Sequence, residues 1–580
     1  MIEICALRQQ LLDCDGHALV IGGPGSGKTT IALKKAVARI KEGMNPGQSV
    51  MFLSFSRAAV ARIAEASKTE AAKDQRGLLD IQTFHSFFLE MLRSHAYLLG
   101  APKRLQILMP QDERALSGGI KESKNLVAWQ AWIDERERLF REEGRIAFDL
   151  FAPNAASLLE RSAHLRQLIA QRHPLLIVDE AQDTGPHAWR CIELLSSLTQ
   201  MICLADLEQQ IFDYLPGIGP ERIEAIKAAL HPMEIDLGAQ NHRSPGSEIV
   251  AFGNDILSGN ARGAPYKGVS SLTYNPKTSD PTKRLRMALG ALQRQIRKET
   301  GKWGRSIAIL VPSGATAAKV SAALSAAEKP VKHKLLFDEA EALLAARFAA
   351  FLLEPKLESN RSVDLALSLD LLADTKRAIG LAEAKRLLAW AASIRAGKTS
   401  RAALVTTTKA LLEQLALSNF TGNPARDWIT VKKALRTSGH EDLARVAKHL
   451  DYLVAFNRGK RISANLTEAW QRDGQYTNAR AALDLALAQD QILDGLDDPA
   501  GLQVMTIHKS KGKQFDGVIV ARGARHDGTQ MVSDFIWWED QHPYPRSRKI
   551  LRVAVTRAQV HTLILEPMWP QCPLLAPHSL

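Results

Sequence analysis

The stretch that decides the fold is Ala18–Thr29, with the sequence ALVIGGPGSGKT. Ala18–Ile21 is a short apolar run typical of a buried strand, and Thr30–Val37 has apolar residues at helical spacing. Between them lies GxxxxGK[ST], whose glycines let backbone N–H groups turn towards phosphate oxygens at the start of a helix. The alternative is a glycine-rich turn followed by a chance Lys-Thr pair. The strand and the helix on either side favour a P-loop.

In a P-loop, Lys28 would reach the β- and γ-phosphates of the nucleotide, and Thr29 would offer its hydroxyl to Mg²⁺. The residues that we expect to bind the nucleotide here are Gly22, Gly23, Pro24, Gly25, Ser26, Gly27, Lys28 and Thr29.

A second motif completes the first. Pro174–Val178 is a continuous apolar run, as expected of a strand buried on both faces, and it ends in Asp179-Glu180-Ala181-Gln182-Asp183. A carboxylate at the end of such a strand can hold Mg²⁺, which we assign to Asp179. Glu180 can then orient and deprotonate the attacking water. The alternative is a solvated acidic turn, but together with the P-loop the motif predicts an ATPase.

Length and composition set the wider limits. At roughly 150 residues per domain, 580 residues predict about four domains. The apolar fraction of 46% and charged fraction of 24% exclude a mostly disordered, collagen-like or coiled-coil chain. The five cysteines form no CxxC pair, which excludes a disulfide scaffold and argues against a zinc ribbon. The net charge of +13 fits either a basic surface or a nucleic-acid partner.

Membrane and secretory signals are missing from the sequence. No uncharged apolar run reaches the ~18 residues of a transmembrane helix. The first residues lack a basic segment followed by an apolar one, so no secretory signal is expected. We therefore expect a cytoplasmic protein without a membrane partner.

The motif DEAQD after a buried strand resembles motif II of the UvrD/Rep-like superfamily 1 DNA helicases. Further segments resemble that family's other motifs in the family's order, from about residue 9 to about residue 565. They are Gln9 or Gln10 (Q motif), 52–57 (motif Ia), 82–86 (the TFH motif), 205–212 (III), 240–244 (IV), 307–311 (IVa), 504–515 (V) and 553–558 (VI).

The resemblance implies an α/β fold with two RecA-like P-loop domains, each a parallel sheet flanked by helices and each carrying a mainly helical insertion. The implied segments are 1–90 and 163–245 (domain 1A), 91–162 (insertion 1B), 246–350 and 500–580 (domain 2A) and 351–499 (insertion 2B). Apolar periodicity predicts helices in several of these segments, namely Asn125–Leu139, Ala155–Ala170, Val363–Leu371, Ala382–Ala396 and Ala479–Ala488.

For the ATP site, the resemblance assigns three more residues to catalysis. Gln209 matches the glutamine that contacts the γ-phosphate and the attacking water, and Arg243 and Arg557 match two arginines that clamp the γ-phosphate from the second domain. A planar guanidinium suits this task because charge on the transferred phosphoryl group must meet fixed donors. The alternative for each arginine is a surface salt bridge.

The resemblance also assigns contacts to the nucleoside. Gln9 or Gln10 would read the adenine edge. Thr30 and His242 stand where the family usually has an arginine and a tyrosine that sandwich the base, and Gln514 stands where a glutamate accepts from ribose. These departures put nucleotide selectivity in doubt, but they remove no residue that handles phosphate.

DNA contacts are implied by residues of two kinds. Single-strand motors stack bases on aromatic side chains, which accept any base. The aromatic residues at the family's DNA-facing positions are Phe55, Phe212 and Tyr214, and the residues matching contacts to the sugar–phosphate backbone are Thr83, His85, Thr506 and His508. The alternative is core packing for the aromatic residues and a structural role for the histidines; for Phe84, next in the TFH motif, core packing is favoured.

The sequence therefore predicts an ATP- and Mg²⁺-dependent DNA helicase and translocase that moves 3′ to 5′ on single-stranded DNA and acts at duplex junctions. The alternative is an ATP-driven DNA-sensing regulatory subunit of a nuclease complex; the helicase component of Gabija-type antiphage systems is a relative in general plan. Few residues follow Arg557, so we expect any nuclease to be a separate subunit.

Overall fold

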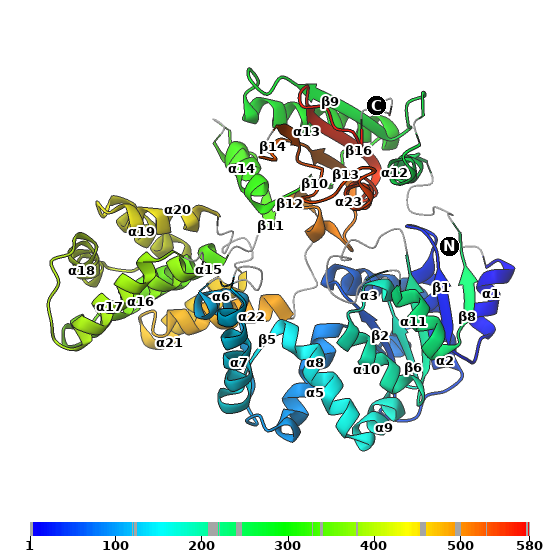
Figure 1. Ribbon diagram of the computed structural model, residues 1–580, viewed down its shortest axis with the longest axis horizontal. Coiled ribbons are helices and arrows are strands. Elements are labelled where there is room, and N and C mark those ends of the chain that lie inside the picture. The colour runs from blue at the N-terminus through cyan, green and yellow to red at the C-terminus, as the bar shows by residue number, and fades with distance from the viewer. Residues whose placement is uncertain are drawn as a thin grey trace. The chain divides into compact units, whose positions relative to one another are not determined.

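The structure is a computed structural model of the chain. It describes residues 4–118, 120, 125–206, 219, 221–238, 246–260, 262–326, 329–336, 340–378, 381–452, 460–492, 500–528, 530–575 and 578. The helices and strands of the chain are labelled in Figure 1. The chain divides into two compact units. Unit 1 is Met1–Met91, Ala152–Phe337 and Gly495–Leu580, and unit 2 is Leu92–Phe151 and Asp338–Asp494.

Unit 1 contains two parallel sheets of six strands each. The first sheet has the order β3-β2-β6-β7-β1-β8. Its strands are β1 (Ala18–Ile21), β2 (Val50–Ser54), β3 (Leu79–Thr83), β6 (Leu175–Val178), β7 (Gln200–Ala205) and β8 (Met233–Asp236). Every residue of β2 and β6 is buried, as the continuous apolar runs require. The predicted strands at 18–21 and 174–178 are thus confirmed.

Helices flank the first sheet and connect its strands. They are α1 (Ala6–Asp13), α2 (Lys28–Lys41), α3 (Arg57–Glu70), α4 (Lys73–Arg76), α5 (Phe84–His95), α8 (Phe151–Arg161), α9 (Ala163–Arg172), α10 (Pro186–Ser196) and α11 (Glu221–Leu230). The core between helices and sheet includes Val20, Ile31, Phe52 and Ile177.

The second sheet has the order β11-β12-β10-β13-β16-β9. Its strands are β9 (Val269–Tyr274), β10 (Ser306–Val311), β11 (Lys334–Leu336), β12 (Gly501–Thr506), β13 (Phe515–Ala521) and β16 (Ala558–Pro567). An antiparallel pair, β14 (Ala524–His526) and β15 (Met531–Ser533), follows β13. The helices of this part are α12 (Ile249–Ser258), α13 (Pro281–Thr300), α14 (Gly314–Ser325) and α23 (Pro545–Val555). The predicted α/β class with two parallel sheets flanked by helices is confirmed.

Unit 2 is mainly helical, with one short parallel pair formed by β4 (Gln106–Leu108) and β5 (Arg145–Ala147). Its helices are α6 (Pro110–Ser117), α7 (Leu126–Glu143), α15 (Ala340–Leu353), α16 (Arg361–Arg377), α17 (Glu383–Arg395), α18 (Ala403–Ala416), α19 (Pro424–Thr437), α20 (Glu441–Tyr452), α21 (Lys460–Asp473) and α22 (Ala479–Ile492). Among the described residues, no helix of either unit is long and apolar enough to cross a membrane.

The two chain segments of unit 2 share one core. Met109 belongs to the same buried cluster as the helices α15–α22, and Ile107 and Phe148 pack against it. An ion-pair network crosses the same junction, because Arg347 of α15 binds both Asp112 of α6 and Asp484 of α22. Segments more than two hundred residues apart in sequence therefore fold together. The predicted division into 1A, 1B, 2A and 2B remains a prediction.

Most predicted helices are confirmed, but 155–170 is not one helix. It divides into α8 and α9 at Ser162, whose hydroxyl accepts a hydrogen bond from the Leu165 backbone N–H (3.1 Å). A serine hydroxyl that accepts from a backbone N–H in this way caps the start of a new helix. The apolar periodicity of the sequence does not reveal this break and predicts one continuous helix.

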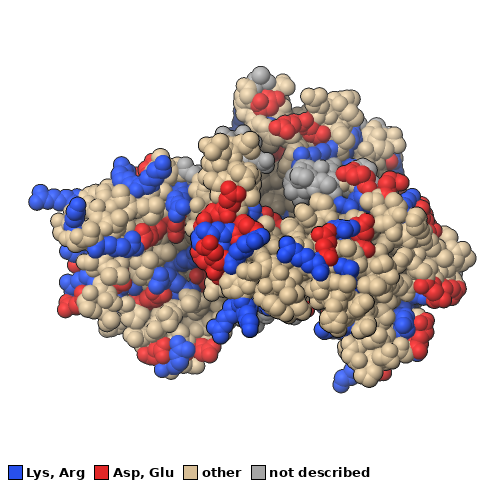
Figure 2. Space-filling model, turned by 60° about the horizontal axis from the view of Figure 1, so that its bottom comes forward, with Lys and Arg blue, Asp and Glu red and all other residues tan. Residues whose placement is uncertain are grey.

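Basic and acidic side chains are interspersed over the face of the molecule shown in Figure 2. The net charge of +13 therefore does not form a single basic field on this face.

Candidate nucleotide and nucleic-acid site

The P-loop connects β1 to α2. Gly25 and Gly27 have φ values of +85° and +90°, a backbone conformation that favours glycine, and Gly27 is the N-cap of α2. Lys28 opens the helix, and its Nζ donates to the carbonyl oxygens of Gly22 (2.5 Å) and Gly23 (3.1 Å). The ammonium group is thus held inside the curve of the loop, at the positive end of a helix dipole. This is the arrangement that binds phosphate.

Two features of the loop fit a bound phosphate chain. Ser26 is 1% exposed, and among the described residues its Oγ has no hydrogen-bond partner, so it can still take part in a polar contact. A Cβ at Gly22 would lie 2.6 Å from that oxygen, so only glycine leaves this space open. Thr29 and Thr30 follow in the first turn of α2 and are half-buried. These residues fit a nucleotide with Mg²⁺ at Thr29.

A residue of α1 supports the loop, although the sequence interpretation chose its neighbours. Arg8 is 3% exposed, and its Nη2 donates to the Ser26 carbonyl (3.2 Å). Gln9 and Gln10 are exposed on the same helix, and Gln9 Nε2 donates to Asp13 (2.8 Å). Arg8 differs from Gln9 and Gln10 in being buried. The apolar periodicity of a helix as short as α1 does not predict which of its polar residues is buried.

The acidic motif lies at the carboxyl end of β6, two strands away from β1 in the sheet. The Asp179 backbone N–H donates to Leu53 O (2.8 Å), and its Oδ2 accepts from the Ser54 hydroxyl (3.2 Å). Glu180 adopts a left-handed conformation (φ +54°), which a non-glycine residue keeps only when its surroundings enforce it. The chain therefore turns sharply between Asp179, the predicted Mg²⁺ ligand, and Glu180, the predicted base.

The two carboxylates differ in their electrostatic surroundings. Burial and the neighbouring charge of Glu180 raise the pKa of Asp179. Burial alone would raise the pKa of Glu180 too, but Lys511, Lys28, a hydrogen bond from Gln182 and Arg557 hold it below its ordinary value. Glu180 is thus the carboxylate that its surroundings keep ionised.

The second sheet contributes two cations to this acidic region. Arg557, which precedes β16, is 2% exposed and lies within electrostatic range of Glu180 and Asp206. Its Nε donates to Val553 O (3.1 Å), and burial lowers its pKa. Lys511, between β12 and β13, forms an ion pair with Asp183 and lies 4.0 Å from Glu180 Oε2. Lys28 Nζ in turn lies 3.7 Å from Asp206 Oδ2.

The other predicted nucleotide contacts stay predictions. Gln514 Oε1 accepts from Gln559 Nε2 (3.0 Å) at the start of β13. The remaining predicted residues, Gln209, His242 and Arg243, lie outside the described residues.

The predicted DNA contacts of the first sheet have structural partners. Phe55 is half-buried, and its ring stacks on Phe84 at a centroid distance of 4.7 Å, while Phe84 is 1% exposed and belongs to the interior. Thr83 Oγ1 accepts from the Ser86 backbone N–H (3.1 Å) at the start of α5, so it acts as a helix cap. His85 is exposed. Phe55 and His85 are therefore the residues of this group with surface available for a ligand.

In the second sheet, Thr506 Oγ1 accepts from the Lys509 backbone N–H (3.4 Å). His508 packs against Trp537 with ring centroids 5.4 Å apart, and burial lowers its pKa. Phe212 and Tyr214 lie outside the described residues.

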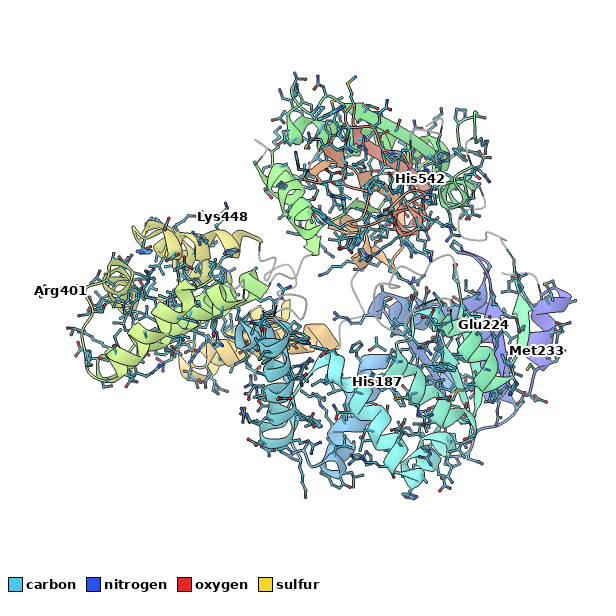
Figure 3. The ribbon with its side chains drawn as sticks, in the orientation of Figure 1. His187, Glu224, Met233, Arg401, Lys448 and His542 are labelled. Carbon is cyan, nitrogen blue, oxygen red and sulfur yellow. The ribbon has the colours of Figure 1, made fainter. Side chains whose placement is uncertain are left out.

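The sequence interpretation missed a surface between β14 and α23. Arg546 lies over the Trp537 ring at 4.3 Å, and Arg525 lies over the Trp538 ring at 4.1 Å. Trp538 is 60% exposed, and both tryptophans line a cavity of about 610 Å³. His542 lines the same cavity and is labelled in Figure 3, and none of the lining residues belongs to the P-loop. The paired Trp537-Trp538 was the available sequence signal. Aromatic rings with guanidinium partners are suited to nucleobases.

Comparison with known proteins agrees with these features. Residues 6–131 and 121–218 match the UvrD/REP helicase N-terminal domain. Over 296 residues the chain is 24% identical to the ATP-dependent DNA helicase Rep of Escherichia coli (strain K12), covering 45% of this chain and 44% of that protein.

Two other relatives are similar at the same level. DNA helicase II of Haemophilus influenzae is 26% identical over 290 residues, covering 42% of this chain and 39% of the relative. The ATP-dependent DNA helicase PcrA of Staphylococcus aureus (strain Mu50 / ATCC 700699) is 22% identical over 299 residues, covering 45% and 40%. The match thus spans less than half the length of each curated relative. The chain therefore carries a UvrD/REP helicase N-terminal domain and is distantly homologous to the Rep, UvrD and PcrA superfamily 1 helicases.

Proposed function

We propose that the chain is an ATP-dependent DNA translocase and helicase that moves 3′ to 5′ on single-stranded DNA. The observation that carries this proposal is the meeting of three elements in unit 1. They are the P-loop lysine Lys28, the carboxylates Asp179 and Glu180, and the buried Arg557 supplied by the second sheet. The relatives' names describe ATP-dependent DNA helicases, which supports DNA as the track.

In this proposal each side chain has one role. Lys28 neutralises the β- and γ-phosphates, and Thr29 with Asp179 holds Mg²⁺, which would offset charge on the phosphates. Glu180 orients the water and takes its proton. Arg557, together with Arg243 from the sequence interpretation, stabilises charge on the transferred phosphoryl group. Gln209 would link the nucleotide to the DNA site.

The DNA track is proposed over the two sheets. Phe55 and His85 serve the first sheet, and Thr506 and His508 the second. The cavity beside Trp538 adds a stacking surface with a cationic partner in Arg525. Bases stacked on such side chains are held without sequence preference, as a translocase requires.

The test has two arms. ATP hydrolysis should be slow without DNA and rise with oligothymidylate, and the logarithm of DNA affinity should fall with the logarithm of salt by roughly 0.7 per phosphate contact. Turnover indifferent to DNA at every salt concentration would contradict a coupled motor. In the second arm, a duplex with a 3′ single-stranded tail should be separated and one with a 5′ tail should not. DNA-stimulated hydrolysis without strand separation would favour the DNA-sensing regulatory subunit instead.

A further inference from the structure

One buried ion pair in unit 1 joins the two sheets and was given no role in the function proposed above. Lys511, 8% exposed at its side chain, pairs with Asp183, which is 1% exposed. The same ammonium lies 4.0 Å from Glu180 Oε2. A sheltered lysine between two carboxylates is costly to desolvate, so its surroundings must compensate it closely.

The loop that carries Lys511 is tightly built. Ser510 is fully buried and its hydroxyl donates to Ile507 O (2.6 Å), while the Lys513 backbone N–H donates to Ser510 O (2.9 Å). Gly512 follows with φ +79°, and a Cβ there would lie 2.2 Å from Ser56 Oγ. A glycine at this position lets the loop lie directly against the start of α3. The backbone of this loop therefore fixes where Lys511 begins, next to the start of α3.

Asp183 depends on this lysine for its charge balance. Its Oδ2 receives the Lys511 ammonium and, more weakly, Gln182 Nε2 at 3.4 Å. Among the described residues, its buried Oδ1 has no hydrogen-bond partner. Burial raises the pKa of Asp183 to about 7 even with Lys511 beside it, so without the ammonium this carboxylate would take up a proton and lose its ion pair.

Gln182 connects this pair to Glu180. It is fully buried, its Nε2 donates to Glu180 Oε2 (2.6 Å), and its Oε1 accepts from the Asp206 backbone N–H (3.1 Å). Both ends of the amide are therefore fixed, and the Glu180 carboxylate has one preferred orientation. The chain of contacts runs Lys511–Asp183–Gln182–Glu180, from the second sheet to the proposed base.

We infer that Lys511 is a positioning residue for ATP hydrolysis. The second sheet supplies this lysine to hold Asp183, and Asp183 in turn helps to orient Glu180 to accept a proton from the attacking water. The inference rests on the proposed function and extends it, because it makes the base dependent on the second sheet as well as on the first. The end of the loop that carries Lys511 also contacts Arg557. The Arg557 backbone carbonyl accepts from the Phe515 N–H (3.0 Å), and Arg557 Nη1 donates to Lys513 O (3.5 Å).

The experiment uses the full chain with ATP, Mg²⁺ and oligothymidylate, and four variants: Lys511→Met, Lys511→Arg, Asp183→Asn and the double Lys511→Met/Asp183→Asn. Nucleotide affinity is measured by equilibrium binding, and kcat and KM by DNA-stimulated hydrolysis. In Lys511→Met, kcat should fall at least about tenfold while nucleotide Kd stays within about threefold, because orientation and not binding is lost. Lys511→Arg should restore most of kcat, since it returns the charge.

The double variant separates positioning from simple loss of fold. It removes both buried charges, so it should fold at least as well as Lys511→Met and show less loss of kcat than the two single losses multiplied together. Lys376→Met serves as the matched control, because it breaks a comparably sheltered lysine–carboxylate pair with Asp442 (2.8 Å) in unit 2. Its kcat should stay within about twofold of the unmodified chain.

The outcomes are distinguishable. If the unmodified chain does not hydrolyse ATP, the proposed function fails. If it does, and Lys511→Met keeps kcat within about threefold, the inference about Lys511 fails and the proposed function stands. Equal losses in Lys511→Met and Lys376→Met, or independent losses in the double variant, would also overturn the positioning role.

Discussion

The two sheets of unit 1 have the same number of strands and the same parallel orientation, yet they present opposite ends to the acidic residues. In the first sheet the P-loop follows β1, Asp179 follows β6 and Asp206 follows β7, so all three lie at carboxyl ends of strands. In the second sheet Arg557 lies immediately ahead of the amino end of β16, and Lys511 lies in the loop between the carboxyl end of β12 and the amino end of β13. The fold alone therefore does not decide which edge of a sheet is functional.

Helix dipoles explain why the two edges carry different chemistry. The first sheet presents the amino-terminal end of α2 at Lys28, where backbone N–H groups favour an anion. Arg557 instead lies just beyond the carboxyl end of α23, and its Nε binds the Val553 carbonyl of that helix. A helix end of this polarity repels phosphate, so a charged side chain must supply the attraction. In the proposed function, the first sheet would bind phosphate through backbone N–H groups together with Lys28, and the second sheet through cationic side chains alone.

The largest effect should come from the first sheet. Glu180→Gln should abolish hydrolysis while ATP still binds, because the amide keeps the shape of the side chain and loses the base. Lys28→Ala should abolish turnover together with binding, because phosphate neutralisation is lost. Equilibrium ATP binding and DNA-stimulated turnover measured on both variants check this. A Glu180→Gln variant that hydrolyses ATP at close to the parental rate would contradict the assignment of the base.

The next effect measures the contribution of the second sheet. Arg557→Ala should lower kcat on the order of a thousandfold, about 4 kcal/mol, with little change in ATP affinity, because the guanidinium acts mainly in the transition state. The sequence-based prediction for Arg243→Ala is the same. Turnover is to be compared with Arg522→Ala, which removes a buried arginine bound to Pro567 O and Pro570 O. If Arg557→Ala turns over within about threefold of the parent, the division of labour between the sheets is wrong.

A glycine tests how closely the two sheets must approach. Gly512→Ala should lower DNA-stimulated turnover and stability, because the new Cβ would lie 2.2 Å from Ser56 Oγ. Gly439→Ala is the matched control, since its φ of +83° is as strained but its Cβ meets nothing within 4 Å. Both should lose roughly 1 kcal/mol of stability from backbone strain, and only Gly512→Ala should lose more, as denaturant unfolding would show. Equal losses in both variants would mean that the loop does not pack on α3.

The smallest effect concerns the opposite edge of the first sheet. His17 precedes β1, its Nδ1 accepts from the Met201 backbone N–H (3.1 Å), and burial lowers its pKa. The unfolded chain therefore binds more protons than the folded one as pH falls through about 6.5, so acid destabilises the fold. His17→Asn keeps an acceptor without titrating. Melting temperature should therefore fall less between pH 7 and pH 5 in this variant than in the parent, with turnover at pH 8 unchanged. An identical acid response in the parent and the variant would exclude His17 as a contributor.

The sequence predicted the strands and the helix around the first sheet's candidate site, because these elements follow one another locally in the chain. A strand, a glycine loop and a helix follow one another at 18–37, and a buried strand runs directly into Asp179 and Glu180. Arg8 and Lys511 could not be assigned because their partners lie far away in the chain and only the fold brings them together. For Thr83 the motif predicted a ligand contact, which stays a prediction, and the fold adds that its hydroxyl caps α5.

The shared core of unit 2 bears on how freely this protein can be re-engineered or diversified. Unit 2 is built from two separate segments of chain, the predicted insertions, and Met109, Ile107 and Phe148 of the earlier segment pack with the helices of the later one. Replacing the earlier segment alone by a foreign one would expose apolar surface and leave Arg347 without its Asp112 partner. Replacing the later segment alone would expose apolar surface and leave Asp112 without Arg347. The two segments are therefore expected to be exchangeable only together, as one unit. We also expect that substitutions on one side of their junction are tolerated only with matching substitutions on the other side.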